Sequence, residues 1–212
     1  MFSNILEYIK HPVTSTLNKL EQENLKSSGL KSLIISGLIA LISVIATYIS
    51  ITSLYSADSW YANYYSEAQL RKMRIEAIED AQLFTNFFKI TIMVLIVIAV
   101  VALILYIIAK ILKSSLEYKD VLSLINSVLL VTIIGIILSI LLAKIYEPLG
   151  AILLYATSIY TSLTFINAYR DALYIEDVDK LVLVSTIVFV IVMIILSLLI
   201  SNSLSNLFSS II

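Results

Sequence analysis

The chain has 212 residues, of which 60% are hydrophobic and 14% are charged, and its mean hydropathy is +1.00. A soluble domain averages about 45–50% apolar and about 25% charged residues, so this composition indicates a protein whose solvent is lipid. The net charge of −1 gives no positive field to gather nucleic acid, and the lack of cysteine with a single histidine excludes disulfides, thiolate metal sites and imidazole clusters.

Residues 1–31 are polar, and they predict a cytoplasmic amphipathic segment ahead of the membrane domain. Pro12 suits the first turn of a helix, and Val13, Leu17 and Leu20 follow it at the spacing of one apolar stripe. Two interpretations stay open: the stripe docks a partner or the cytoplasmic leaflet, or it packs on the protein's own bundle. A Ser-Ser-Gly sequence at 27–29 predicts a break before the first span.

Five apolar runs are long enough to cross a bilayer, which needs about 20 mostly apolar residues per helix. No Asp, Glu, Lys, Arg or His lies inside any run, and lysines flank the ends, where their ammonium groups reach the headgroups. We therefore expect an all-α, polytopic membrane domain over residues 32–212, a bundle of five transmembrane helices. The runs cover residues 33–54, 90–109, 121–143, 149–168 and 181–200.

Basic residues predict the orientation of these five helices. Nine lie on the side that holds the N-terminus, which favours a cytoplasmic N-terminus in a multi-pass integral membrane protein, located in the plasma membrane if the source is prokaryotic. These nine are Lys10, Lys19, Lys26, Lys31, Lys110, Lys113, Lys119, Arg170 and Lys180. The opposite side holds Arg71, Lys72, Arg74, Lys89 and Lys144.

The segment between the first two runs begins with a group of aromatic residues: Trp60, Tyr61, Tyr64 and Tyr65. Rings with a polar tip are typical of the membrane–water interface. A stacking platform for a sugar or a peptide is the alternative interpretation of the same residues.

An apolar stripe at helical spacing starts at Ser66 and continues into the second run without Gly or Pro. Charged residues occupy the other faces of this stretch. We therefore expect residues 66–109 to form one helix, with an extension outside the membrane over about residues 66–89.

Small and hydroxyl residues repeat at helical spacing in the third and fourth runs, a pattern that lets membrane helices pack closely. The stripes are Thr132, Gly135 and Ser139 in the third run and Thr157, Thr161 and Thr164 in the fourth. Close packing is one interpretation, and a polar ligand groove between the two helices is the other.

Asn126 lies on roughly the opposite face of the third run from the stripe around Gly135. Because an unpaired amide is costly in lipid, Asn126 is expected to face the bundle and bond to a neighbouring helix. The antiparallel turn near Pro148 favours Thr164 as the partner, with Asn167 as second choice. The groove or clasp would thus involve Asn126 with Thr157, Thr161 and Thr164.

No pattern points to catalysis, so we predict no enzyme, no catalytic residue, no cofactor and no metal. A catalytic triad needs a base, and His11, the only histidine, lies beside Pro12 at an expected helix start. The glycine-rich phosphate-binding motifs and the metalloprotease motif are absent from the sequence.

Two segments, Tyr-Ile-Lys-His-Pro-Val-Thr at residues 8–14 and Leu-Glu-Tyr-Lys-Asp-Val-Leu at residues 116–122, carry local motifs. With these motifs the chain resembles the Yip family, the Ypt/Rab-interacting membrane proteins and their prokaryotic relatives. Residues 8–14 are similar to the basic, proline-containing segment before the first span of prokaryotic members. Residues 116–122 are similar to the polar entry to the third span, and the spacing of the spans also matches. The resemblance implies a non-enzymatic integral membrane protein in membrane organisation or trafficking.

Two functions are therefore considered. The first is a scaffold in the lipid bilayer that recruits membrane or cytoplasmic protein partners, or further copies of itself as an oligomer. The alternative is a small-molecule or lipid transporter, or an accessory subunit of one, that uses the groove between the third and fourth spans.

Overall fold

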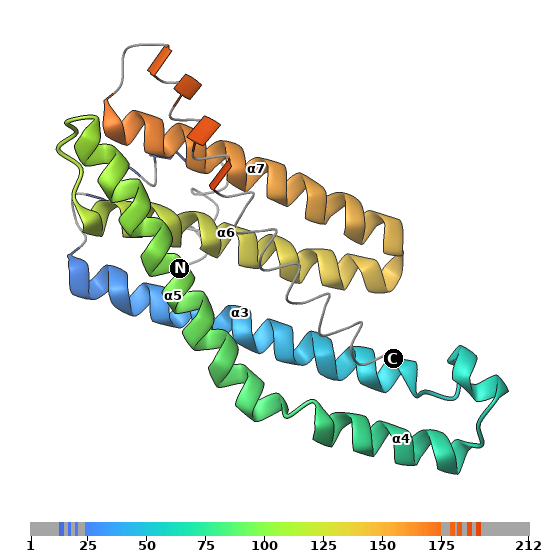
Figure 1. Cartoon of the computed structure of the whole chain (residues 1–212). Helices are drawn as coiled ribbons and strands as arrows, with labels where there is room; N and C mark the ends of the chain where they lie inside the picture. Colours follow the sequence, from blue (N-terminus) through green and yellow to red (C-terminus); the bar gives the residue numbers. More distant parts are fainter. Residues whose placement is uncertain are drawn as a thin grey trace. The chain divides into compact units, whose positions relative to one another are not determined.

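A computed structural model of the chain describes residues 24–174 and twelve further positions. These are Val13, Thr14, Leu17, Leu20, Asp179, Lys180, Val182, Leu183, Thr186, Ile187, Val190 and Ile191. At positions 144 and 147 the description covers the backbone alone. In this part of the chain the regular structure is helical, with no strand (Figure 1).

The continuous described stretch holds five α-helices and one short 3-10 helix. In order they are α3 (Leu25–Leu54), η1 (Trp60–Asn63), α4 (Glu67–Asp80), α5 (Leu83–Ile111), α6 (Tyr118–Ile145) and α7 (Glu147–Leu173). Four stretches among the described residues are long and apolar enough to cross a membrane: α3, the stretch Glu67–Ile111 that includes α5, α6 and α7. They contain the first four predicted runs, whereas most of the fifth, residues 181–200, lies outside the described residues.

Helix α3 begins earlier than the sequence predicts. The side-chain Oδ1 of Asn24 accepts a hydrogen bond from the backbone N–H of Ser27 at 2.8 Å, which is the bond of an N-cap. The helix then continues through Gly29, so the predicted break at Ser-Ser-Gly is wrong. A capped first turn satisfies the backbone there, and Ser28 is fully buried.

The expected single helix over residues 66–109 is also wrong, because a turn at Ala81 and Gln82 separates α4 from α5. Gln82 adopts the left-handed conformation with φ 42°, which ends α4 without a glycine. The side-chain amide of Asn86 donates to the carbonyl of Ala81 at 2.7 Å and so satisfies an acceptor that the turn exposes. A capping box at Ser66 and Gln69 fixes the start of α4.

Contacts divide the described chain into two compact units. We call them the hairpin unit, which holds the residues up to Gly29 and those from Val97 onward, and the connector unit, Leu30–Ile96. The connector unit contains most of α3, with η1, α4 and the first half of α5. The hairpin unit contains the start of α3, the second half of α5, α6 and α7.

Helices α6 and α7 form the antiparallel pair at the centre of the hairpin unit (Figure 1). Tyr146 is extended, with φ −155°, and Pro148 stands in the first turn of α7, where a missing N–H is tolerated. The first two turns of α6 are enclosed, since every residue from 121 to 126 is buried. This buried start of α6 is the core of the unit.

Candidate functional site

Asn126 is a buried amide in the core of the hairpin unit. Its side chain is 3% exposed, and its Nδ2 donates a hydrogen bond of 2.9 Å to the backbone carbonyl of Ser28 in the first turn of α3. The expectation that Asn126 faces the bundle and bonds to another helix is confirmed. The bond ties the start of α6 to the start of α3, two segments that lie 98 residues apart in the sequence.

The predicted partners of Asn126, Thr164 and then Asn167, are wrong, since the described bond goes to α3 rather than α7. The reason is the helical rotation between Asn126 and Gly135. Nine residues at about 100° each place them on opposite faces of α6. Gly135 faces α7, so Asn126 faces away from it. Thr164 is itself buried.

Helices α6 and α7 touch at two glycines. A Cβ built on Gly135 would lie 2.2 Å from Cγ2 of Thr157, and one on Gly150 would lie 2.4 Å from Cβ of Ala143. Only a residue without a Cβ lets the two backbones approach so closely. The contact of Gly135 with Thr157 agrees with the packing interpretation of the small-residue stripes, whereas Gly150 and Ala143 lie outside the predicted stripes. At the level of Gly135, the side chain of Thr157 occupies the space between the helices.

Three hydroxyls of the two stripes, those of Thr132, Ser139 and Thr161, bond within their own helices. Thr161 donates to the carbonyl of Thr157 at 2.9 Å, and Ser139 donates to that of Gly135 at 2.7 Å. Thr132 makes the same bond to Val128 at 3.0 Å. Bonds of this kind satisfy a hydroxyl in an apolar medium without a second helix or a ligand.

Two tyrosines join α5 to its neighbours, which the sequence did not indicate. The hydroxyl of Tyr169 in α7 is buried and donates to the carbonyl of Leu105 in α5 at 2.5 Å. The hydroxyl of Tyr118 at the start of α6 donates to the carbonyl of Ala99, also in α5, at 3.3 Å. With Asn126, these residues share one geometry: a side-chain donor reaches a backbone carbonyl of another helix. We call the three bonds carbonyl clasps.

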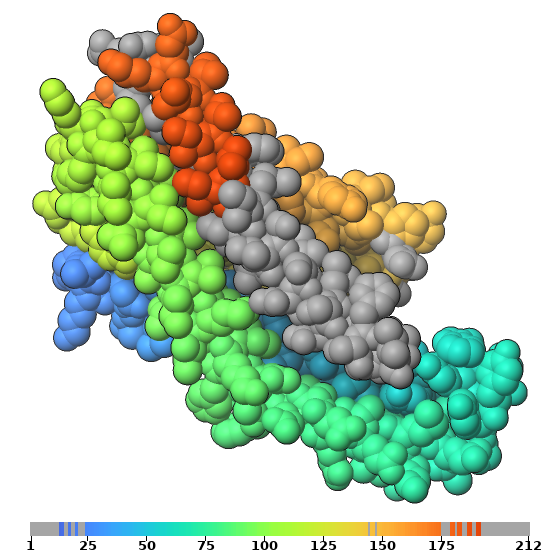
Figure 2. Space-filling view, viewed as in Figure 1, coloured from blue at the N-terminus to red at the C-terminus, as the bar shows by residue number. Residues whose placement is uncertain are grey.

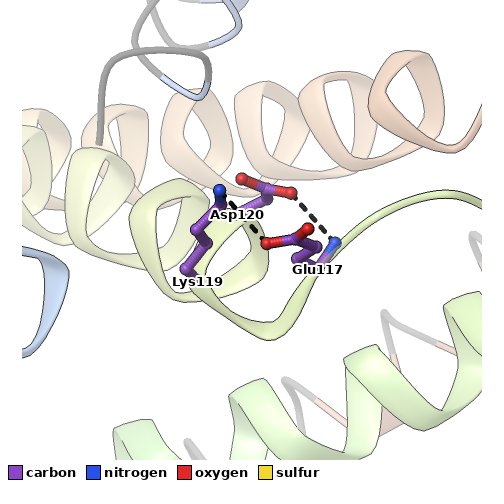
Figure 3. A network of polar contacts seen from close by, with 3 residues as sticks. All are labelled: Glu117, Lys119 and Asp120. Atoms are coloured by element: carbon purple, nitrogen blue, oxygen red, sulfur yellow. Dashed lines mark hydrogen bonds and ion pairs between the residues drawn. The ribbon is translucent and has the colours of Figure 1, made fainter. Parts of the chain in front are cut away.

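The start of α6 carries a small polar network (Figure 3). The carboxylate of Asp120 accepts from the backbone N–H of Glu117 at 2.9 Å, and the ammonium of Lys119 lies 3.1 Å from Oε2 of Glu117. The first bond satisfies a backbone donor at the helix start, and the acidic side chain suits the positive end of the helix dipole. The exposed ion pair adds little stability. Among the described residues, no three His, Cys, Asp or Glu side chains group as a metal site.

Comparison with known families identifies the chain. The family model described as the Yip1 domain matches residues 7–199, most of the chain. The chain belongs to the Yip family. No curated protein sequence and no solved structure matches it.

The two segments that resemble the Yip family lie in different parts of this structure. Residues 116–122 contain the entry to α6, where Leu116, Val121 and Leu122 are buried and the polar residues between them form the capping network. The segment that resembles the Yip family is therefore the start of α6 in this Yip-family chain. Of residues 8–14, Val13 and Thr14 alone are described, and both are helical.

The predicted partner-docking residues are described one by one. Val13, Leu17 and Leu20 are helical, and each is half-buried. Thr14, beside them, is exposed. The stripe of this Yip-family protein is therefore partly covered and partly accessible, which agrees with either of the two interpretations.

Proposed function

We propose that this Yip-family chain is a non-enzymatic membrane scaffold, which holds a rigid helical core in the bilayer and recruits protein partners in membrane organisation or trafficking. Yip-family proteins are generally non-enzymatic membrane proteins, which supports the first half of the proposal. The second half rests on the accessible edge of the N-terminal stripe, Val13, Leu17 and Leu20.

One observation carries the scaffold proposal: the polar side chains between helices of the hairpin unit serve as clasps. Asn126, Tyr118 and Tyr169 each donate to a carbonyl of a neighbouring helix. In a transporter or an enzyme, buried polar groups line a path or meet a substrate. Here the same chemistry holds helices together, which suits a protein whose task is to present a fixed surface.

We further propose five membrane spans with the N-terminus in the cytoplasm. The support is the apolar run at 181–200 beyond the four described stretches, and the excess of basic residues on the N-terminal side. The chain has no cysteine, so single cysteines at Ser3, Ser115 and Ser210 are selective reporters. An impermeant maleimide added to intact cells should label position 210 and spare positions 3 and 115. Labelling of 3 and 210 from the same side would overturn the five-span topology.

Partner recruitment is tested by photo-crosslinking in the native membrane. A benzophenone side chain at Leu17 should yield a discrete heavier adduct, while one at Ile107, which is 50% exposed on α5, should yield lipid adducts only. The partner is then identified by mass and expressed, and its binding to purified chain is compared with binding to the Leu17→Ala variant. Adducts at Leu17 that contain only this chain or lipid would contradict recruitment and favour packing of the stripe on its own bundle.

A further inference from the structure

Five aromatic rings form one continuous cluster where the chain leaves α3. The ring centroid of Tyr61 lies 4.2 Å from that of Trp60, 5.7 Å from Tyr55 and 6.1 Å from Tyr65. Trp60 in turn meets Tyr64 edge-on at 5.7 Å. Tyr61 is therefore the centre of the cluster, and η1 is the short helix that brings the rings together.

The outer rings of this cluster are open to the surroundings. The side chains of Trp60, Tyr64 and Tyr65 are 60%, 73% and 40% exposed. Figure 2 shows the surface of this segment in teal. Between residues 55 and 66 the only charged residue is Asp58. An exposed group of large rings with so little charge is unusual in water and needs an apolar neighbour.

A second aromatic group stands where the chain enters the next membrane helix. Phe84 and Phe88 in the first turns of α5 are 79% and 49% exposed, and their rings meet edge-on at 5.0 Å. Phe87 joins them at 5.3 Å from Phe88. The two groups bracket one connecting segment, so both lie on the same side of the membrane.

We propose that the cluster around Tyr61 rests in the headgroup layer of the bilayer, so that η1 is an interfacial foot rather than part of a loop in water. The neighbour that covers the rings is phospholipid. Rings with a hydroxyl or an indole N–H favour this layer, where one end of the ring is apolar and the other is wet. Leu54, the last residue of α3, leads directly into the cluster, so the rings follow the end of a membrane span.

The geometry favours lipid over a sugar or a peptide as the occupant. A stacking platform needs free ring faces, and at the centre of the cluster the rings of Trp60 and Tyr61 cover one face of each other, with only 34° between their planes. Tyr61 is half-buried for the same reason. Lipid chains and headgroups require no free face, since they fill space around ring edges and hydroxyls.

The test uses the native chain, because Trp60 is its only tryptophan. The purified protein is placed in phosphatidylcholine vesicles that carry bromine near the headgroup, at mid-chain or at the chain end. An interfacial foot lies about 5–10 Å into the boundary, so the shallow bromine should quench emission about twofold more than the deepest one. As a matched control, Trp60→Phe with Leu103→Trp puts the fluorophore on the exposed face of α5, where the deepest bromine should quench most.

Three results would overturn the proposal. The first is quenching of Trp60 by aqueous iodide as complete as that of free tryptophan, with no response to any brominated lipid. The second is quenching of Trp60 that follows the depth profile of the Leu103→Trp control. The third is an emission that ignores lipid but shifts on addition of a soluble oligosaccharide or peptide, which would assign the rings to a soluble ligand.

Discussion

Gly135→Ala adds one methyl group at the contact between α6 and α7, and it should lower the free energy of unfolding. Gly135→Ala would place a Cβ 2.2 Å from Cγ2 and 2.5 Å from Oγ1 of Thr157, whereas carbon atoms in contact prefer about 3.5–4.0 Å. The helices α6 and α7 must then separate by about 1 Å or Thr157 must change rotamer, and overpacking of this kind costs about 1–3 kcal/mol. Against this, alanine gains about 1 kcal/mol in helix propensity over glycine. We expect a net loss of about 2 kcal/mol, because the overlap is at the severe end.

Gly37 in α3 is the matched control, since a Cβ there meets nothing within 4 Å. Gly37→Ala has only the propensity gain and should stabilise the chain by about 1 kcal/mol. The free energy of unfolding is measured for both variants by titration with a denaturing detergent, with helicity as the signal. Adding Thr157→Ala to Gly135→Ala removes the two closest atoms, Cγ2 and Oγ1, and leaves the Cβ of residue 157 at 2.9 Å, so it should restore most of the loss. Such a coupling is expected only of residues in contact.

The reasoning about this contact would be refuted by a Gly135→Ala variant that is as stable as Gly37→Ala. A loss that Thr157→Ala fails to restore would refute it as well. In that case α6 and α7 would not meet at this pair of residues.

Three further predictions concern other sites. Lys113 ends α5 in the left-handed conformation, with φ 59°, so Lys113→Gly should stabilise the chain by about 1 kcal/mol, while Lys113→Ala, which also removes the charge, should not. Asn126→Leu and Tyr169→Phe each delete one clasp and should each lower the free energy of unfolding by about 0.6 kcal/mol; an unchanged stability in both would show that the clasps contribute nothing. Asn86→Leu removes the donor to Ala81, so deuterium uptake should rise around Gln82 and stay unchanged in α6, and equal uptake in both proteins would contradict this role of the amide.

The sequence predicted four of the five expected spans as apolar helices that the structure describes, because their signal is composition over about 20 residues. Helices α3, α5, α6 and α7 contain the runs at 33–54, 90–109, 121–143 and 149–168. What it missed depends on one or two residues. The cap at Asn24 moved the start of α3, and the left-handed Gln82 divided a stretch that has neither glycine nor proline. Periodicity averages over such positions and cannot find them.

The clasps were harder to foresee than the packing. A stripe of small residues predicts a contact face, and Gly135 against Thr157 agrees with it. The partner of Asn126 required knowledge of which helix lies on each side of α6. The 180° offset between Asn126 and Gly135 is visible in the sequence, and it argued against α7 as the source of the partner. The sequence could not indicate the acceptor on Ser28, because the acceptor is a backbone carbonyl, which every residue has.

Because their acceptors are backbone carbonyls, the clasps constrain the side chain on one helix of each pair. Each clasp needs a particular side chain on one helix only, since every residue supplies a backbone carbonyl. Positions 28, 99 and 105 contribute only a backbone carbonyl to these three bonds, while positions 118, 126 and 169 contribute the side chain. Paired substitutions between the helices should therefore be missing from alignments, and contact inference from covariation should overlook the very bonds that join α6 and α7 to α3 and α5.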